Sequence, residues 1–251
     1  MAARSIIVIP ARLASTRLPR KLLLRETGKS VLQHTYESAA RAAIPAEVCV
    51  AADHDEIAAD VRSFGGLVVM TSPDCASGTD RVAEVARARP DVDVFVNVQG
   101  DEPEISPHAI DLAADLLVQN PDVQMATLAT PIRSRSKLEE PSCVKVVFDD
   151  RGRALYFSRS PIPYARTWHD GLLEENPPHF HQHIGLYAYR REFLLQLADL
   201  PRSDAEKLES LEQLRVLSAG LDILVGVIDE PTIGIDTPDD YRAFVSRVLG
   251  R

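Results

Sequence analysis

The sequence predicts an α/β fold with a mostly parallel central sheet and a β-hairpin lobe inserted in its second half. Two observations carry this prediction. Short apolar runs alternate with segments of helical spacing through the first half of the chain, which is typical of βαβ units. After Pro131, two further apolar runs flank the turn residues 149–152, which is typical of an antiparallel hairpin. We expect one domain over residues 1–251, in which about 132–190 form the inserted lobe.

The first half of the chain supplies most of the predicted sheet. The run Ile6–Ile9 is wholly apolar, as expected for a strand buried on both faces. The predicted strands are Ile6–Ile9, Glu47–Ala51, Leu67–Met70, Val92–Val98 and Gln124–Ala129, and the predicted helices are Ser30–Ala43, Asp55–Phe64, Thr79–Arg89 and Pro107–Gln119. This alternation places helices on both faces of a parallel sheet.

The second half is less regular. Residues 161–182 are rich in proline, histidine and aromatic side chains, and they are predicted to be irregular. The strands predicted here are Val144–Phe148 and Ala154–Ser158, which form the hairpin, followed by Ile184–Tyr189 and Ile223–Val227. The lobe therefore interrupts a pattern that resumes near residue 184.

Two helices are predicted near the carboxyl terminus. Ser203 and Glu206 form a capping-box pattern. The apolar stripe that follows is Leu208, Leu211, Leu214 and Leu217, and Gly220 would end the helix. Thr237 and Pro238 begin the last helix as its N-cap and first helical residue.

Composition and charge exclude several classes of protein. The net charge of −9 argues against non-specific binding of nucleic acid, which needs a broad basic face. We find neither a secretory signal nor a run of eighteen apolar residues, so we expect no membrane association. The three cysteines, Cys49, Cys75 and Cys143, form no paired motif. We therefore expect a cytoplasmic protein with reduced thiols.

A basic loop follows the first predicted strand and is the most informative feature of the chain. It carries Arg12, Arg17, Arg20, Lys21 and Arg25, with no acidic residue before Glu26. In open parallel sheets, ligands bind beyond the carboxyl ends of the strands. Guanidinium and ammonium groups form charge-assisted hydrogen bonds with phosphate oxygens. The sequence therefore predicts that Arg12, Arg17 and Lys21 bind a polyphosphate.

Three further segments could complete such a site. Residues 77–81 open a helix whose N-terminus could hold an anion, although an ordinary N-cap explains them equally well. Asp101 follows a strand and a glycine, and Asp236 precedes a helix cap. Magnesium is commonly held by one or two carboxylates together with substrate phosphates. The alternatives are a polar turn at Asp101 and a residue favoured by the helix dipole at Asp236.

Taken together, these segments resemble the 3-deoxy-manno-octulosonate cytidylyltransferase family. The resemblance runs from Ile6 to about Tyr241. Its segments, in order, are IPARLASTRLPRK, CASGTDR, FVNVQGDEP, CVKVV, ALYFSRSPIP, HIGLYAYR, LESLEQLRVL and GIDTPDD. Arg20 and Leu22 depart from the pattern, because the family usually has glycine and proline at these two positions.

The resemblance implies a Rossmann-like nucleotidyltransferase fold and a reaction. CMP would pass from CTP to 3-deoxy-D-manno-octulosonate (KDO), giving CMP-KDO and pyrophosphate for lipopolysaccharide synthesis. It also implies Mg²⁺ as cofactor, no covalent intermediate, and a homodimer formed through the inserted lobe, which would also bind sugar. In-line displacement at phosphorus mainly needs positioning and neutralisation of charge, which agrees with the residues found.

The resemblance also implies residue roles. Those implied for the nucleotide are Pro10, Ala11, Arg12, Arg17, Lys21, Ser77, Gly78, Thr79 and Arg81. Those implied for the sugar are Gln99, Arg159, His183, Glu212 and Gln213. Asp101 and Asp236 would bind Mg²⁺ and count as catalytic together with Arg12 and Lys21. For Glu212 and Gln213, the alternative is the solvated face of an amphipathic helix.

Two other functions stay open at this point. One is a cytidylyltransferase for another sugar acid or for an amino analogue of KDO. The other is a nucleotide-sensing protein that keeps the fold but not the reaction. The intact pair Asp101 and Asp236 argues against the sensor, because a sensor need not retain both carboxylates.

Overall fold

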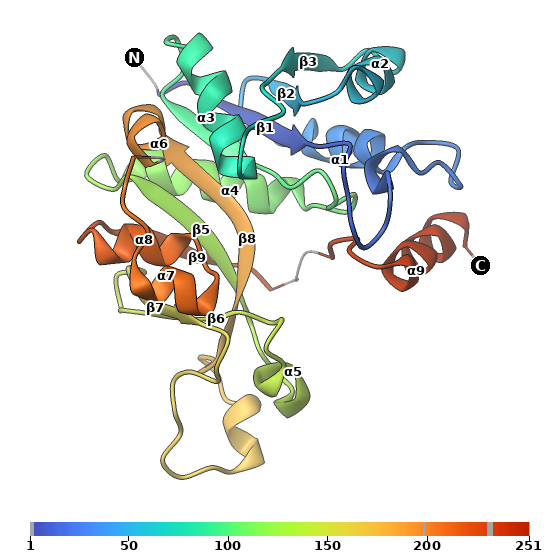
Figure 1. The fold of residues 1–251 in the computed structure, drawn as a ribbon. Helices are drawn as coiled ribbons and strands as arrows, with labels where there is room; N and C mark the ends of the chain where they lie inside the picture. Colours follow the sequence, from blue (N-terminus) through green and yellow to red (C-terminus); the bar gives the residue numbers. More distant parts are fainter. Residues whose placement is uncertain (1–2, 198, 230–232, 251) are drawn as a thin grey trace.

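The computed structural model describes residues 3–197, 199–229 and 233–250 (Figure 1). The strands are β1 (Ser5–Ala11), β2 (Val48–Ala52), β3 (Leu67–Met70), β4 (Val94–Asn97), β5 (Met125–Pro131), β6 (Lys145–Phe148), β7 (Ala154–Ser158), β8 (His181–Arg190) and β9 (Ile223–Val227). The helices are α1 (Val31–Ala39), α2 (Asp55–Ser63), α3 (Gly78–Ala88), α4 (Pro107–Gln119), α5 (Arg135–Glu139), α6 (Arg191–Leu197), α7 (Asp204–Glu209), α8 (Gln213–Ser218) and α9 (Pro238–Leu249). Two 3₁₀ turns complete the list, η1 (Lys21–Leu23) and η2 (Asp170–Leu173).

One sheet runs through the molecule in the order β3-β2-β1-β4-β8-β5-β9. Strands β1 and β2 pair in parallel, as do β1 and β4, β2 and β3, and β5 and β9. Strand β8 returns from the lobe and enters between β4 and β5, antiparallel to both. The predicted α/β fold with a mostly parallel central sheet is therefore confirmed, and β8 makes its centre mixed.

Both faces of the sheet are buried, because helices cover each of them. Ile7 and Ile9 of β1 face one core with α1, α2, α4 and α9. Ile6 and Val8 face the other core with α3, α6 and α8. Successive side chains of a strand point to opposite faces. This two-sided burial explains why the first strand reads as a continuous apolar run rather than an alternating one.

The inserted hairpin forms as predicted. Strands β6 and β7 pair antiparallel, and β6 also pairs with the beginning of β8. Beyond them the lobe projects away from the main sheet and carries α5 and η2 (Figure 1). It has a small core of its own, made of Ile132, Leu138, Cys143, Leu173 and Phe180. Neither α5 nor α6 was predicted from the sequence.

Within the described ranges, every helix is too short or too polar to cross a bilayer.

The single helix predicted after Ser203 is wrong: two short helices, α7 and α8, stand in its place. The chain breaks at Ser210, whose φ of 53° lies in the left-handed region. The Ser203 hydroxyl does cap the amide of Glu206, but the Glu206 carboxylate pairs with Arg215, 2.6 Å away. Nine residues along a continuous helix span about 13.5 Å, so this buried ion pair requires the fold-back. Leu208, part of the predicted apolar stripe, is 87% exposed.

Candidate active site

Two adjoining pockets lie where the carboxyl ends of β1 and β4 meet the N-termini of α3 and α9. The smaller has a volume of about 410 Å³ and the larger about 530 Å³. Gly78, Gln99 and Asp236 line both, so the two spaces share a boundary. This is the edge of the sheet at which open α/β folds bind ligands.

We call the smaller space the basic pocket, because the loop after β1 forms its wall. The predicted nucleotide residues that line it are Pro10, Ala11, Arg12, Arg17, Lys21, Ser77, Gly78 and Arg81. Thr79 lies in the larger pocket instead. A Cβ atom at Gly78 would lie 3.3 Å from Pro10, so this glycine allows α3 to begin close to the end of β1.

Lys21 brings the two predicted metal ligands together. Its Nζ contacts Asp101 and donates to Asp236 Oδ1 at 3.1 Å and to the Ile235 carbonyl at 2.8 Å. Arg17 donates to the same Asp236 oxygen at 2.9 Å. The Ile235 amide in turn donates to the Asp101 carbonyl at 2.8 Å, which joins the two loops directly. Cations and carboxylates thus meet at one edge of the basic pocket.

The other two basic residues of the loop face elsewhere. Arg20 pairs with Glu56, and Arg25 pairs with Asp60, both on α2. Arg20 also has a φ of 55°, a left-handed conformation that favours glycine. Its backbone therefore adopts a conformation that a glycine would take more readily, while its side chain pairs the loop with α2.

The start of α3 supports the ordinary capping interpretation and adds a buried cation. The Ser77 hydroxyl accepts from the Asp80 amide at 3.1 Å, and Asp80 accepts from the Ser77 amide at 3.0 Å. Arg81 is 4% exposed and lines the basic pocket. It donates to the Thr71 hydroxyl at 2.6 Å and lies 3.6 Å from Asp53. These contacts fix its guanidinium at the pocket wall.

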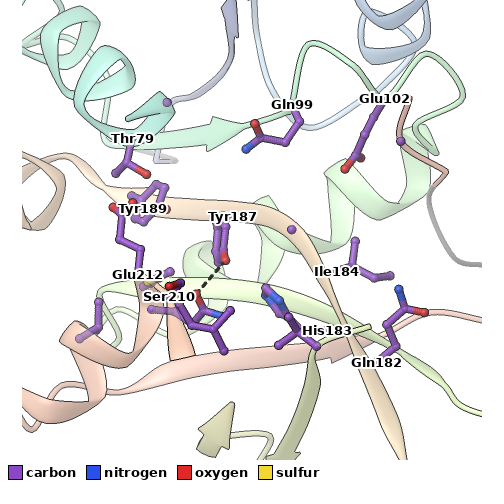
Figure 2. Close-up of a pocket in the computed structure, with 18 of the residues that line it drawn as sticks. Thr79, Gln99, Glu102, Gln182, His183, Ile184, Tyr187, Tyr189, Ser210 and Glu212 are labelled. Atoms are coloured by element: carbon purple, nitrogen blue, oxygen red, sulfur yellow. Dashed lines mark hydrogen bonds between the residues drawn. The ribbon is translucent and has the colours of Figure 1, made fainter. Parts of the chain in front are cut away.

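Four of the predicted sugar residues line the larger pocket: Gln99, His183, Glu212 and Gln213. Figure 2 labels the first three of them. The break at Ser210 turns the chain so that Glu212 and Gln213 face this space. Gln213 is 4% exposed, so the interpretation of these two residues as a solvated helix face is wrong.

Arg159 is the predicted sugar residue that the structure leaves out of both pocket linings. Its Nε donates to the Glu209 carbonyl at 2.7 Å, and Nη1 donates to the Pro141 carbonyl at 3.2 Å. A contact with the sugar would require the guanidinium to leave these carbonyls. Its predicted role stays a prediction.

Several polar groups of the larger pocket are buried. His183 Nε2 lies 2.9 Å from the Thr127 hydroxyl, and burial lowers the pKa of the ring to about 3, so the imidazole is neutral near pH 7. The Tyr187 hydroxyl donates to Gln213 Oε1 at 3.3 Å, the dashed line in Figure 2. Burial raises the pKa of Tyr187, and the nearby Glu212 adds to the shift.

Two buried atoms in this pocket have no hydrogen-bond partner within the described part of the chain. They are the donor Gln213 Nε2 and the acceptor Gln182 Oε1. An unpaired buried polar group costs about 1–3 kcal/mol, so such atoms mark a place where a ligand would supply the missing bonds. Burial raises the pKa of Glu212, and a hydrogen bond with Thr79 opposes the shift.

Gln182, Tyr187 and Tyr189 also line the larger pocket and were not predicted from the sequence. A signal for the two tyrosines was present. They lie four and six residues beyond His183 on the same strand, and side chains at even spacing share one face of a strand. No comparable pattern marks Gln182.

Asp101 and Asp236 fit a magnesium ion held jointly with phosphate. Residues 3–197, 199–229 and 233–250 contain no group of three or more His, Cys, Asp or Glu side chains that could hold a metal by themselves. Two carboxylates beside a cationic pocket match the way Mg²⁺ is commonly bound, through one or two carboxylates plus substrate phosphates.

Comparison with known proteins identifies the family of the chain. Residues 6–223 match the family model described as cytidylyltransferase, which defines the class of the chain. A 3-deoxy-manno-octulosonate cytidylyltransferase of Rhodopirellula baltica is 52% identical over 246 residues, covering 98% of each chain. That of Syntrophotalea carbinolica is 49% identical over 245 residues, covering 97% of this chain and 98% of its own. The chain belongs to the 3-deoxy-manno-octulosonate cytidylyltransferase family and is a nucleotidyltransferase.

Solved structures place the fold in the same group. A CMP:2-keto-3-deoxy-manno-octonic acid synthetase complexed with CTP matches with a TM-score of 0.91 and 42% identity, covering 99% of each chain. A cytidylyltransferase from Leptospira borgpetersenii matches with a TM-score of 0.65 at 17% identity, which supports the fold alone. The predicted Rossmann-like nucleotidyltransferase fold is confirmed.

Proposed function

We propose that this chain transfers CMP from CTP to KDO, releasing pyrophosphate and CMP-KDO. The observation that carries the proposal is the pair of adjoining pockets that meet at Gly78, Gln99 and Asp236. One is lined by cations that suit a triphosphate, and the other by buried amide and carboxyl groups that suit hydroxyls. Two substrates bound side by side can react directly, without a covalent intermediate. The solved relative complexed with CTP supports the nucleotide assignment.

The reaction is a displacement at the α-phosphate. The anomeric hydroxyl oxygen of the sugar bonds to the α-phosphorus and loses its proton. The bond from that phosphorus to the bridging oxygen breaks, and pyrophosphate leaves with this oxygen. Arg12, Arg17 and Lys21 line the pocket in which the triphosphate would lie, so they offset its charge and hold it in line.

Asp101 and Asp236 would hold Mg²⁺ beside the same phosphates. The bound ion would supply further neutralisation of charge on the phosphoryl oxygens. Lys21 lines the basic pocket together with both carboxylates and contacts each of them, so it can also contact a phosphate held there.

The larger pocket would hold KDO. A sugar hydroxyl both donates and accepts hydrogen bonds, so it can satisfy the donor Gln213 Nε2 and the acceptor Gln182 Oε1. Glu212 can accept from further hydroxyls at the same wall. Gly78, Gln99 and Asp236 line both pockets, so they mark the boundary at which the reacting hydroxyl must meet the α-phosphate.

We also propose that the lobe at about 132–190 contributes to sugar binding and forms a homodimer. Its residues Ser142, Val144, Gln182 and His183 line the larger pocket. On its outside, Leu155 is 62% exposed, Tyr156 39% and Tyr164 87%, and aromatic residues are enriched at protein interfaces. Light scattering on the purified chain tests the dimer.

We also propose a cytoplasmic location, which fits the free cysteines.

The activity is tested by magnesium-dependent pyrophosphate release from CTP in the presence of KDO, with UTP and sugar-free controls. We expect release only with CTP and KDO together. Release with another sugar acid or an amino analogue, but not with KDO, would replace the sugar assignment. CTP binding without release under any sugar would support the sensing alternative.

A further inference from the structure

Arg159 links three segments through four contacts. Its backbone amide donates to Glu209 Oε2 at 2.9 Å, and its Nε donates to the Glu209 carbonyl at 2.7 Å. Its Nη1 donates to Pro141, and its carbonyl accepts from Lys145 Nζ. These contacts tie the end of β7 to three other segments: the loop after α5, the start of β6 and the last turn of α7.

Glu209 lies at the centre of this link and directly precedes the break between α7 and α8. Besides the Arg159 amide, its carboxylate accepts from the Ser158 hydroxyl at 2.6 Å. The next residue, Ser210, has the left-handed φ and begins the wall of the larger pocket. A left-handed serine persists only where its surroundings determine the backbone. Glu209 supplies that constraint from the N-terminal side.

Lys145 fixes the opposite wall. It is fully buried, and its Nζ donates to the carbonyls of Cys143 at 2.6 Å and Glu140 at 3.0 Å as well as to Arg159. The three contacts use all three N–H groups of the ammonium. The neighbouring residues Ser142 and Val144 line the larger pocket. Through Arg159, the two walls are therefore set at a fixed separation.

We propose that Glu209 is a positioning residue for the sugar pocket. It lies outside the lining of both pockets, and it acts by holding the turn at Ser210 against the end of β7. This turn aims Glu212 and Gln213 at the sugar. The proposal rests on the proposed function for the identity of the ligand, but the local order it predicts does not depend on any ligand.

The test compares Glu209→Ala and Glu209→Gln with the control Asp204→Ala. Asp204 is on the same helix, and its side chain is 92% exposed and pairs with Lys207. We expect Glu209→Ala to raise the KM for KDO roughly tenfold and to change the KM for CTP less than about twofold. Glu209→Gln restores most of the loss, because its amide can accept from the Arg159 amide and donate to the Ser158 hydroxyl. In the control Asp204→Ala, both KM values should equal those of the wild-type chain.

Hydrogen exchange supplies a readout that needs no substrate. Amides of residues 210–216 should exchange roughly tenfold faster in Glu209→Ala, while those of α3 do not change. Unchanged exchange at 210–216, or an equal rise in both KM values, would overturn the proposal. Equal losses in the alanine and glutamine variants would also overturn it, because they would point to a direct role of the charge.

These experiments distinguish failure of the proposed function from failure of the proposed role of Glu209. A wild-type chain without KDO-dependent turnover contradicts the proposed function, while the exchange result still decides the role of Glu209. If Glu209→Ala does not fold, Ser158→Ala removes one of its two carboxylate contacts. This variant should raise the KM for KDO roughly threefold, with faster exchange at 210–216. Wild-type values in both measurements would contradict the role of Glu209.

Discussion

The basic pocket and the larger pocket satisfy their polar groups in opposite ways. In the basic pocket, Lys21 and Arg17 pair with Asp101 and Asp236, and the Arg17 side chain is 66% exposed. In the larger pocket, the polar groups are buried and mostly uncharged, and Gln213 Nε2 has no described partner. Exposed charges such as those of Arg17 and Asp236 exchange one partner for another at little cost. Buried amides do not. The basic pocket can therefore change charge partners when a substrate binds, while the geometry of the larger pocket is fixed.

The largest expected effect comes from removing a carboxylate of the basic pocket. Asp101→Asn should lower kcat at least about 10³-fold, because it removes a proposed ligand of Mg²⁺, and should leave the melting temperature nearly unchanged. Pyrophosphate release and thermal unfolding measure the two. Asp222→Asn, in an ion pair remote from the site, is the matched control. Near-normal activity of Asp101→Asn would contradict the proposal that Asp101 binds Mg²⁺.

The exchange of partners in the basic pocket can be tested directly. Lys21→Gln should lower kcat/KM about 10²-fold, because it removes a cation from the triphosphate site. In the same variant, Mn²⁺ should bind more tightly without nucleotide, because Asp101 and Asp236 lose their ammonium partner. Calorimetric titration measures this binding. Arg12→Gln is the control, since Arg12 lines the same pocket and has no ion pair with either carboxylate among the described contacts. An equal gain in Mn²⁺ affinity in Arg12→Gln would show that the change in net charge alone causes the effect.

In the larger pocket, Gln213→Leu should act on one substrate only. It removes the unpaired donor and the acceptor used by Tyr187, and it keeps the volume nearly constant. The KM for KDO should rise about tenfold or more while the KM for CTP stays constant, since a buried site that lacks a hydrogen bond rejects a polar ligand. Steady-state kinetics with each substrate varied separates the two. Matching changes in both KM values would show that the pockets are not independent.

The neutral His183 predicts how stability depends on pH. Its pKa is about 3 in the folded chain and 6.5 in the unfolded chain, so below pH 6.5 the unfolded state binds the extra proton. The free energy of unfolding should therefore fall as the pH drops from 6.5 towards 3, by about 2 kcal/mol at pH 5 from this residue. Urea unfolding at pH 5 and pH 8 measures it. His183→Gln should show a smaller difference between the two pH values, and an unchanged difference would contradict the assignment.

The smallest expected effect concerns the loop of the basic pocket. Both Arg20→Gly and Arg20→Ala remove the ion pair with Glu56, but only alanine leaves a side chain in the left-handed region. The glycine variant should be more stable than the alanine variant by about 1 kcal/mol. Denaturant midpoints measure the difference. An alanine variant of equal or greater stability would show that the loop takes another conformation in solution.

The sequence was sufficient for the elements whose signals are local. The helix Pro107–Gln119 was predicted with both ends correct, and Ile6–Ile9 was identified as a doubly buried strand. The break at Ser210 was not predictable, because the contacts around it form only in the fold: the ion pair between Glu206 and Arg215, and the bonds from Ser158 and Arg159 to Glu209. A leucine stripe has the same spacing whether or not the helix is broken.

The site divides in the same way. Arg12, Arg17 and Lys21 of the basic pocket were identified from their charge, because a cluster of charge in an acidic chain is visible without a structure, while Ser77, Gly78 and Arg81 were identified by resemblance. In the larger pocket, Gln182 carries no such signal: a neutral amide on a strand does not differ in sequence from any other polar residue. Arg159 was placed by resemblance, and the carbonyls of Pro141 and Glu209 that hold it became visible only in the fold.

Strand β8 has a consequence for how the chain is made. It lies between β4 and β5, although it follows both in the sequence. Residues 181–190 must therefore be synthesised and leave the ribosome before the strands at the centre of the sheet can pair. Until then the nascent chain presents two open strand edges, which are prone to aggregate. The same strand carries His183, so the step that closes the sheet also brings in a wall of the larger pocket. Truncated chains that end before β8 should therefore be cleared by proteolysis rather than persist as folded, inactive protein.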